Sequence, residues 1–273
     1  MSKNDYIGHF GLNQAPFTKA VADNDLWLPG SKKDIVTGLE QAVKEHASGL
    51  IVGEPGVGKT CVLRAVRQSL PQPGYRLTYC HNATLGRRDF YRQLCLAMGL
   101  SPAATAAAVF WAVSNHVEEL GREQVHPVLL LDEAHLLHQD TLDHLHILMN
   151  FAWDSQPLLS LILVGLPELE HRLQLRRNRP LYSRLFYRYH LDPLTHLDTG
   201  EYIRTRMAQA GCQREVFASE AIAMLHEAAT GALRDIDRVA TNALRLAAKQ
   251  NRKLVERDVI MDVVAARMRE EAA

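Results

Sequence analysis

A glycine-rich run at residues 53–60 reads Gly-Glu-Pro-Gly-Val-Gly-Lys-Thr and fits the pattern G-x-x-x-x-G-K-[ST] at every fixed position. Glycines at these positions let the backbone turn with its N–H groups pointing inward, where they hold phosphate oxygens. Lys59 is expected to reach the β- and γ-phosphates, and the Thr60 hydroxyl to bind Mg²⁺. The run predicts a nucleotide site made of Gly53, Glu54, Pro55, Gly56, Val57, Gly58, Lys59, Thr60 and Cys61.

Two adjacent carboxylates follow a second, apolar run. Residues 128–131 read Val-Leu-Leu-Leu, which is typical of a central strand in a sheet covered on both faces. Asp132 follows this strand and is placed to orient Mg²⁺, and Glu133 is placed to polarise an attacking water. An Asp-Glu pair also occurs in ordinary surface turns. Its position after such a strand, downstream of a phosphate loop, favours ATP hydrolysis with ATP and Mg²⁺ as cofactors.

Composition limits the remaining alternatives. A chain of 273 residues has room for one large domain and a smaller one. Its 31 basic and 31 acidic residues cancel, so bulk charge indicates no class of partner. The four cysteines lack C-x-x-C spacing and predict neither a disulfide framework nor a zinc site. Without a signal peptide or a charge-free apolar stretch of about 18 residues, we expect a cytoplasmic protein with no membrane partner.

The periodicity of the chain predicts alternating strands and helices, followed by helices alone. Strands are expected at 49–52, 75–80, 128–131, 159–164 and 187–191, and helices at 31–46, 59–70, 87–98, 104–120 and 138–150. This alternation predicts a parallel sheet with helices on both faces. Further helices are expected at 198–210, 217–228, 233–249 and 256–269. The sequence predicts three parts. Residues 1–30 form an N-terminal segment that packs on the core, residues 31–195 form an α/β nucleotide-binding domain, and residues 196–273 form a helical lid.

These motifs resemble those of the AAA+ ATPases. Several runs are similar to the ExeA-like (general secretion pathway A) and transposition-regulator branch: residues 10–12, 16–17, 53–60, 132–135, 164–169, 188–194 and 231–236. The resemblance covers nearly the whole chain. It implies an α/β P-loop NTPase (AAA+) fold, with a three-layer αβα parallel sheet and a C-terminal all-helical lid.

The resemblance also implies roles for residues outside the two motifs. Arg184 occupies the place of an arginine finger that reaches a neighbouring subunit's nucleotide; the alternative is an ordinary surface arginine. Arg234 resembles a second sensor that contacts the nucleotide from the lid. The first sensor is usually polar, but Leu166 stands there, so hydrolysis is slow or another residue takes the role. A finger acting in trans implies self-assembly head to tail, as a ring or a helical filament.

The partner is less defined by the sequence. Six arginines and no acidic residue lie between Glu170 and Asp192, which fits a phosphate backbone or a subunit interface equally well. Residues 85–91 resemble the stretch with which transposition regulators hold DNA, which implies Arg87 and Arg88 as DNA contacts. The alternative is a solvated helix N-terminus, although two cations there oppose the helix dipole.

Two functional hypotheses follow. The first is an ATPase that oligomerises with ATP on double-stranded DNA and recruits or regulates a transposase or integrase. The alternative is a cytoplasmic ATPase of a secretion or pilus-assembly system that acts on envelope proteins. Secretion members of the family typically continue through a membrane segment, and the end of this sequence at Ala273 favours the DNA hypothesis. A switch that signals to an unknown partner is a third alternative.

Overall fold

The computed structural model describes the chain except for residues 1–4, 72, 82–85, 102–104, 152–154 and 272–273. The described residues divide into two compact units. The helical unit contains 1–29, 55–58 and 192–273, and the α/β unit contains 30–54 and 59–191. Each unit has its own buried core.

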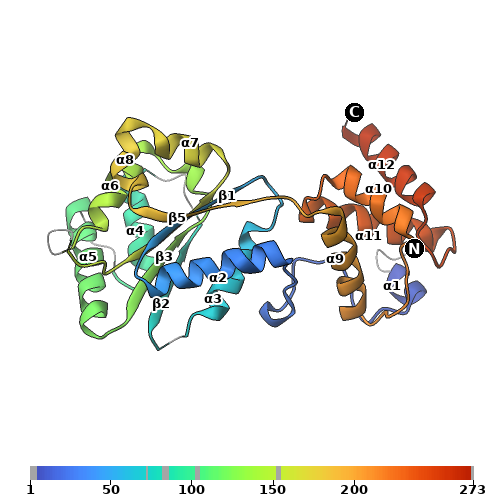
Figure 1. The fold of residues 1–273 in the computed structure, drawn as a ribbon, viewed down its shortest axis with the longest axis horizontal. Coiled ribbons are helices and arrows are strands. Elements are labelled where there is room, and N and C mark those ends of the chain that lie inside the picture. Colours follow the sequence, from blue (N-terminus) through green and yellow to red (C-terminus); the bar gives the residue numbers. More distant parts are fainter. Residues whose placement is uncertain (1–4, 72, 82–85, 102–104, 152–154, 272–273) are drawn as a thin grey trace. The chain divides into compact units, whose positions relative to one another are not determined.

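A five-stranded parallel sheet forms the centre of the α/β unit (Figure 1). Its strands lie in the order β2-β3-β4-β1-β5, and their bounds are β1 Ser48–Gly53, β2 Tyr75–Cys80, β3 His126–Leu131, β4 Ser160–Gly165 and β5 Leu185–Leu191. Strand β4 lies between β1 and β3, with Val52 opposite Gly165 and Leu131 opposite Leu163. The carboxyl ends of these three strands therefore meet at one edge of the sheet, which is where open α/β sheets bind ligands.

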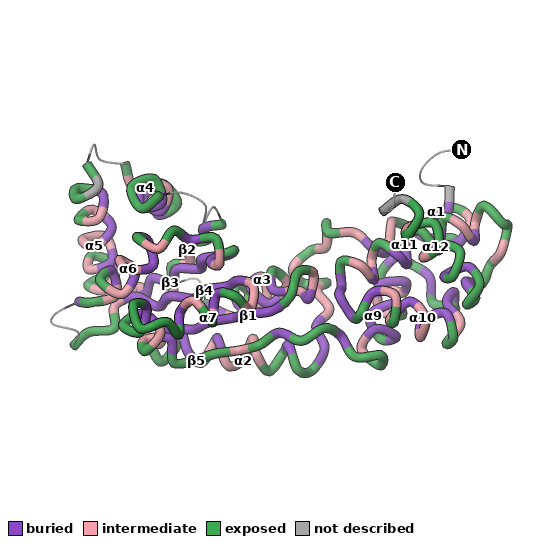
Figure 2. The backbone as a smooth tube through the Cα atoms, turned by 90° about the horizontal axis from the view of Figure 1, so that it is seen from above, coloured by how far each residue is buried: buried purple, intermediate pink, exposed green. Residues whose placement is uncertain are grey.

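Helices cover both faces of this sheet. The helices α2 (Gly30–Lys44) and α3 (Lys59–Ser69) pack against β1 on one face. The opposite face is covered by α4 (Arg87–Ala97), α5 (Ala106–Arg122), α6 (Gln139–Leu148) and α7 (Glu168–Gln174). Every residue of β1, β3 and β4 is buried (Figure 2). Side chains of a strand point alternately to the two faces, so a continuous apolar run is what this double cover requires.

The helical unit is built from α1 (Asp5–Phe10), α9 (His196–Gln209), α10 (Ser219–Ala229), α11 (Leu233–Lys249) and α12 (Arg257–Glu271). A capping box begins α9: the Thr195 hydroxyl accepts from the Asp198 N–H at 3.1 Å, and the Asp198 carboxylate accepts from the Thr195 N–H at 3.0 Å. The buried side of α11 repeats at helical spacing through Ile236, Ala240 and Leu244. No helix within the described residues is long and apolar enough to cross a membrane.

The N-terminal segment packs in the helical unit. Residues 1–30 were expected to pack on the core, and Tyr6, Phe10, Leu12 and Phe17 are buried in the core of the helical unit. The Phe17 ring meets the Phe217 ring edge-on, with 6.2 Å between centroids. The physical reason is that the C-terminal helices present an apolar face, and large aromatic side chains gain most by filling it.

The predicted strands and helices are confirmed, each end lying within two residues of its expected position. Three short helices lie outside that prediction: α1, α7 and the four-residue α8 (Arg179–Tyr182). Short helices carry few apolar repeats; α7 buries only Leu169 and Leu173.

Two stacked histidines, the buried His126 and the exposed His46, lie at the opposite, amino-terminal edge of the sheet. The rings of His46 and His126 stack with 4.0 Å between centroids, and His126 Nε2 lies 2.8 Å from the Ser160 hydroxyl. Burial, together with the neighbouring His46, lowers the pKa of His126 from 6.5 to about 4. The folded protein therefore keeps His126 neutral at pH values at which the unfolded chain protonates it.

This pKa predicts a loss of stability in mild acid. The unfolded chain binds the proton below about pH 6.5 and the folded protein only below about pH 4, so stability present above pH 6.5 is lost as the pH falls through this window. The full cost is of the order of 3 kcal/mol, at about 1.4 kcal/mol per pKa unit. His126→Gln keeps a polar group but cannot ionise, so its free energy of unfolding should fall less between pH 7 and 4.5. Urea unfolding across this range measures it.

The matched control is His171→Gln, which removes an exposed histidine. This variant should keep the pH dependence of the wild type. Equal slopes for the wild type and His126→Gln would contradict the assignment.

Candidate functional site

The phosphate loop joins β1 to α3. Gly56 and Gly58 have φ angles of +84° and +101°, values that residues with a side chain rarely adopt, which explains two of the glycines in the motif. Lys59 is the first residue of α3 and is buried. Its Nζ donates to the carbonyl oxygens of Gly53 at 2.6 Å and Glu54 at 3.0 Å. The loop thus holds its lysine through backbone oxygens at the carboxyl end of β1.

The predicted carboxylates lie at the end of β3 and differ in their surroundings. Asp132 is buried, and its backbone N–H donates to Cys80 at the end of β2. Its carboxylate accepts the hydroxyl of Tyr79 at 2.9 Å and the backbone N–H of Glu133, also at 2.9 Å. Burial, and then the negative charge of Asp132, raise the pKa of Tyr79. Tyr79 therefore remains a hydrogen-bond donor to Asp132 at neutral pH.

Glu133 is exposed and has a left-handed backbone, with φ of +53°. A residue with a side chain adopts this conformation at a cost, and such strain is concentrated at functional sites. The short 3-10 helix Ala134–Leu136 follows directly, so the chain turns sharply at Glu133. The turn directs the Glu133 side chain toward solvent beside the buried Asp132.

The turn after Glu133 is fixed by side chains from α7 and by the end of β4. Arg172 donates to the carbonyl oxygens of His135 at 2.5 Å and Leu137 at 2.8 Å. His135 Nδ1 accepts the backbone N–H of Leu166 at 3.4 Å. A Cβ on Gly165 would lie 3.1 Å from the His135 backbone nitrogen, tighter than nine in ten real Cβ contacts, so a side chain at this position would push against the turn.

The two side chains that the sequence predicts as Mg²⁺ ligands, Thr60 and Asp132, provide oxygen atoms of the kind that Mg²⁺ binds. Mg²⁺ prefers oxygen ligands, keeps several waters and needs only one or two protein groups beside a nucleotide's phosphates. Thr60 is exposed in the first turn of α3, and the Asp132 carboxylate retains lone pairs beyond the two that accept from Tyr79 and Glu133. Among the described residues, no group of three or more His, Cys, Asp or Glu is arranged to hold a metal by itself.

The arginines between Glu170 and Asp192 have different environments. Arg172 holds the turn described above, Arg177 forms a bidentate ion pair with Asp143, and Arg188 lies over the Tyr182 ring at 3.7 Å. Arg184 is half-buried, donates to the Pro180 carbonyl and lies close enough to His146 to lower the pKa of that histidine, after burial. Arg176 and Arg179 are exposed. Much of the basic segment therefore stabilises the α/β unit.

The remaining predicted residues lie on helix ends. Arg87 and Arg88 are the first two residues of α4. Arg87 lies 2.7 Å from His144 Nε2, and burial and this cation together lower the pKa of His144. Leu85, which opens the predicted DNA-contacting stretch, lies outside the described residues. Arg234 is exposed in the first turn of α11, in the helical unit.

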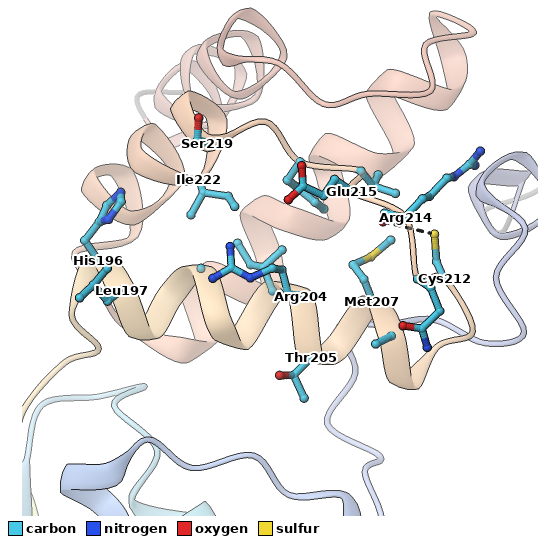
Figure 3. Close-up of a pocket in the computed structure, with 16 residues that line it drawn as sticks. His196, Leu197, Arg204, Thr205, Met207, Cys212, Arg214, Glu215, Ser219 and Ile222 are labelled. Atoms are coloured by element: carbon cyan, nitrogen blue, oxygen red, sulfur yellow. Dashed lines mark hydrogen bonds between the residues drawn. The ribbon is translucent and has the colours of Figure 1, made fainter.

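A cavity of about 530 Å³ opens in the helical unit, between α9 and the chain that leads into α10 (Figure 3). Ile203, Met207 and Ile222 contribute apolar walls. The charged residues of the lining are Arg204, Arg214 and Glu215. None of the predicted site residues that the structure describes lines this cavity. The nucleotide motifs instead lie at an exposed sheet edge, where Lys59 occupies the loop itself.

Comparison with known proteins agrees with the geometry of this edge. Residues 41–173 match the AAA domain family, a range that includes the phosphate loop, both carboxylates and Arg172. The fold is similar to that of Drosophila ORC bound to DNA, with a TM-score of 0.72 and 19% identity over 98% of this chain and 67% of that one. It is also similar to Cdc6p from Pyrobaculum aerophilum, with a TM-score of 0.70 and 16% identity over 88% and 67% of the two chains.

The chain has the AAA+ fold. Its sequence is 31% identical to general secretion pathway protein A of Aeromonas hydrophila over 258 residues. That alignment covers 93% of this chain and 47% of the relative, so the chain spans about half the length of the curated relative that it matches.

Within this AAA+ fold, Tyr79, His135 and Arg172 contact the predicted carboxylates or the turn that carries them, and sequence reasoning assigned none of them a role there. Tyr79 is the penultimate residue of the predicted strand 75–80, and Asp132 directly follows the predicted strand 128–131. This similar position near a strand end is the only sequence signal for a contact between them. Arg172 was one arginine among six, and nothing in its spacing distinguished it.

Arg172 provides a test of how the turn is held. Arg172→Ala leaves the carbonyl oxygens of His135 and Leu137 without this donor and should lower the free energy of unfolding by about 2–3 kcal/mol. Arg176→Ala removes an exposed arginine on the same segment and should change it by less than about 0.5 kcal/mol. Urea unfolding of both variants measures the change in the free energy of unfolding. Equal changes in the two variants would show that the two Arg172 hydrogen bonds do not stabilise the fold.

Proposed function

We propose that this chain binds ATP with Mg²⁺ and hydrolyses it to ADP and phosphate. The observation that carries the proposal is the placement of two groups along one sheet edge, on either side of β4. The Lys59 ammonium is held at the end of β1 by the Gly53 carbonyl, and Asp132–Glu133 follow the end of β3. Phosphate-binding and water-activating groups need to converge in this way for hydrolysis. The match of residues 41–173 to AAA domains supports the same conclusion.

Each residue has a distinct task in this proposal. The backbone N–H groups of 53–60 hold the phosphates, and Lys59 moves its hydrogen bonds from the loop carbonyls to phosphate oxygens. Thr60 and Asp132 hold Mg²⁺, which, when bound, neutralises charge on the β- and γ-phosphates. Tyr79 and the Glu133 N–H orient the Asp132 carboxylate. Glu133 orients and polarises the attacking water, and its exposed carboxylate leaves room for that water.

Two arginines complete the proposed site. Arg234 contacts the nucleotide from the helical unit. Arg184 acts as a finger in a neighbouring copy, which makes the active species a head-to-tail assembly. Its place on the α/β unit supports this role, because Arg184 directly precedes β5, which is an edge strand of the sheet.

Glu133→Gln tests the proposed chemistry. Loss of the carboxylate should lower kcat for ATP by about a hundredfold or more while ATP still binds, because the phosphate loop is intact. Lys59→Ala should instead abolish binding. Steady-state phosphate release and binding of a fluorescent ATP analogue measure the two properties separately.

Glu119→Gln is the matched control, since it makes the same acid-to-amide change at an exposed position of α5 and should retain wild-type turnover. Wild-type turnover in Glu133→Gln would remove Glu133 from its role. A wild-type protein that releases no phosphate in any assembly state would overturn the proposed function.

For the partner of this ATPase, two candidates have separate support. Similarity to general secretion pathway protein A over 93% of the chain favours a secretion-associated ATPase that acts on envelope proteins. The DNA candidate, in which the ATPase assembles on double-stranded DNA and serves a transposase or integrase, is favoured by exposed Arg88, Arg176 and Arg179. The contact of Arg87 with His144 weakens its part in that candidate, because a partnered guanidinium gains less from a phosphate.

Binding to labelled double-stranded DNA separates these candidates. For the DNA candidate, binding should require ATP or a non-hydrolysable analogue, be absent with ADP, and weaken linearly on a plot of log affinity against log salt. Arg87→Ala with Arg88→Ala should reduce that slope by about 1 to 2, at about 0.9 per phosphate contact. Arg122→Ala, which removes an exposed arginine at the end of α5, should leave the slope of log affinity against log salt unchanged. No binding at low salt in any nucleotide state would exclude DNA and leave the secretion candidate.

A further inference from the structure

The His135 imidazole faces two groups that come from different strands. Its side chain is only 14% exposed and follows β3 by four residues. The Nδ1 atom lies 3.4 Å from the backbone nitrogen of Leu166, at the end of β4, and 3.6 Å from Oε2 of Glu133. One ring nitrogen is therefore within reach of both a backbone donor and the carboxylate proposed to activate water.

These two contacts exclude one another. An imidazole nitrogen without a proton accepts a hydrogen bond, and one with a proton donates. When Nδ1 accepts the Leu166 N–H, it has nothing to donate to the Glu133 carboxylate. When Nδ1 carries the proton, it donates to Glu133 and releases the Leu166 N–H. Whether Nδ1 carries the proton therefore decides whether the Glu133 carboxylate is hydrogen-bonded to His135 or contacts only the attacking water.

The surrounding backbone keeps the ring in this place. Arg172 holds the His135 carbonyl at 2.5 Å, which fixes the turn from which the ring projects. Gly165 leaves space for the ring, because a Cβ there would lie 3.4 Å from His135 Nδ1 and 3.1 Å from the His135 backbone nitrogen. Leu166 contributes its N–H but has a hydrocarbon side chain, and the side-chain atom that meets this N–H is His135 Nδ1.

We propose that His135 is a positioning residue for Glu133: its Nδ1 atom, which either accepts the Leu166 N–H or donates to the Glu133 carboxylate, sets the orientation of that carboxylate during ATP hydrolysis. The inference rests on the proposed ATPase function and deepens it. Leu166, after β4, has no side-chain hydrogen-bonding group. The proposal therefore assigns the orientation of the Glu133 carboxylate to His135, in the turn after β3.

Three substitutions at this position test the proposal. His135→Asn places an amide atom where Nδ1 lies, His135→Gln places its amide farther out, near Nε2, and His135→Leu removes polarity. Leu and Gln should lower kcat by about ten- to a hundredfold, the range for groups that orient a catalytic ligand from outside, with KM for ATP changed by less than about twofold. Asn should recover most of the wild-type kcat. His171→Leu, an exposed histidine on α7, should match the wild type.

The results separate the possible failures. Wild-type kcat in His135→Gln, or equal losses in the Asn and Gln variants, would overturn the proposal, because a merely structural ring does not distinguish the two amides by position. A rise in KM with constant kcat would also overturn it. The Asn and Gln variants remain decisive if His135→Leu does not fold, since both are polar and urea unfolding reports their stability. An inactive wild type would instead overturn the proposed ATPase function itself.

Discussion

The parallel alignment of β1, β4 and β3 is the constraint on which the other features depend. Each of these strands is buried on both faces, so its order and register are set by the apolar layers packed above and below. A slip of one residue would move every side chain to the opposite face. Because the register is fixed, the chain leaves the sheet at three neighbouring points, and the phosphate loop, the carboxylates and Leu166 follow from there.

Backbone carbonyl oxygens hold the cations near this edge. Lys59 donates to the carbonyls of Gly53 and Glu54, and Arg172 donates to those of His135 and Leu137. Turns that leave a sheet have carbonyl groups with no partner in a ladder, and a charged donor satisfies two of them at once. The same interaction that stabilises the turns therefore places two positive charges beside the predicted nucleotide site.

Tertiary contacts divide the basic segment before Asp192 into residues with different tasks. Arg172 and Arg177 are committed to the α/β unit, one to backbone oxygens and one to Asp143. Arg176 and Arg179 remain exposed and are available to a partner. A count of arginines in the sequence gives all of them equal weight. Their separation depends on α7 and α8, two helices too short for apolar periodicity to reveal.

The strands and longer helices were predictable because their signals are local. An apolar run such as 128–131 requires cover on both faces wherever it lies, and the loop 53–60 requires glycine for its own backbone angles. The N-terminal segment was predicted to pack on the core without a choice between the two units, because an aromatic residue favours any apolar face and sequence does not say which one is open. Tyr79 beside Asp132 illustrates the same point, since the pairing of β2 with β3 decides that contact.

The sequence by itself determined the phosphate loop, the two carboxylates after an apolar strand, and the alternation that builds a doubly covered parallel sheet. Those features are fixed by residue type and spacing within a few positions along the chain. Only the tertiary structure decided that His135 faces both Leu166 and Glu133, that Arg172 fixes their turn, and that Tyr6, Phe10, Leu12 and Phe17 join the helical core. Such contacts link positions far apart in sequence, and they exist only because strand order brings separate chain ends to the same edge.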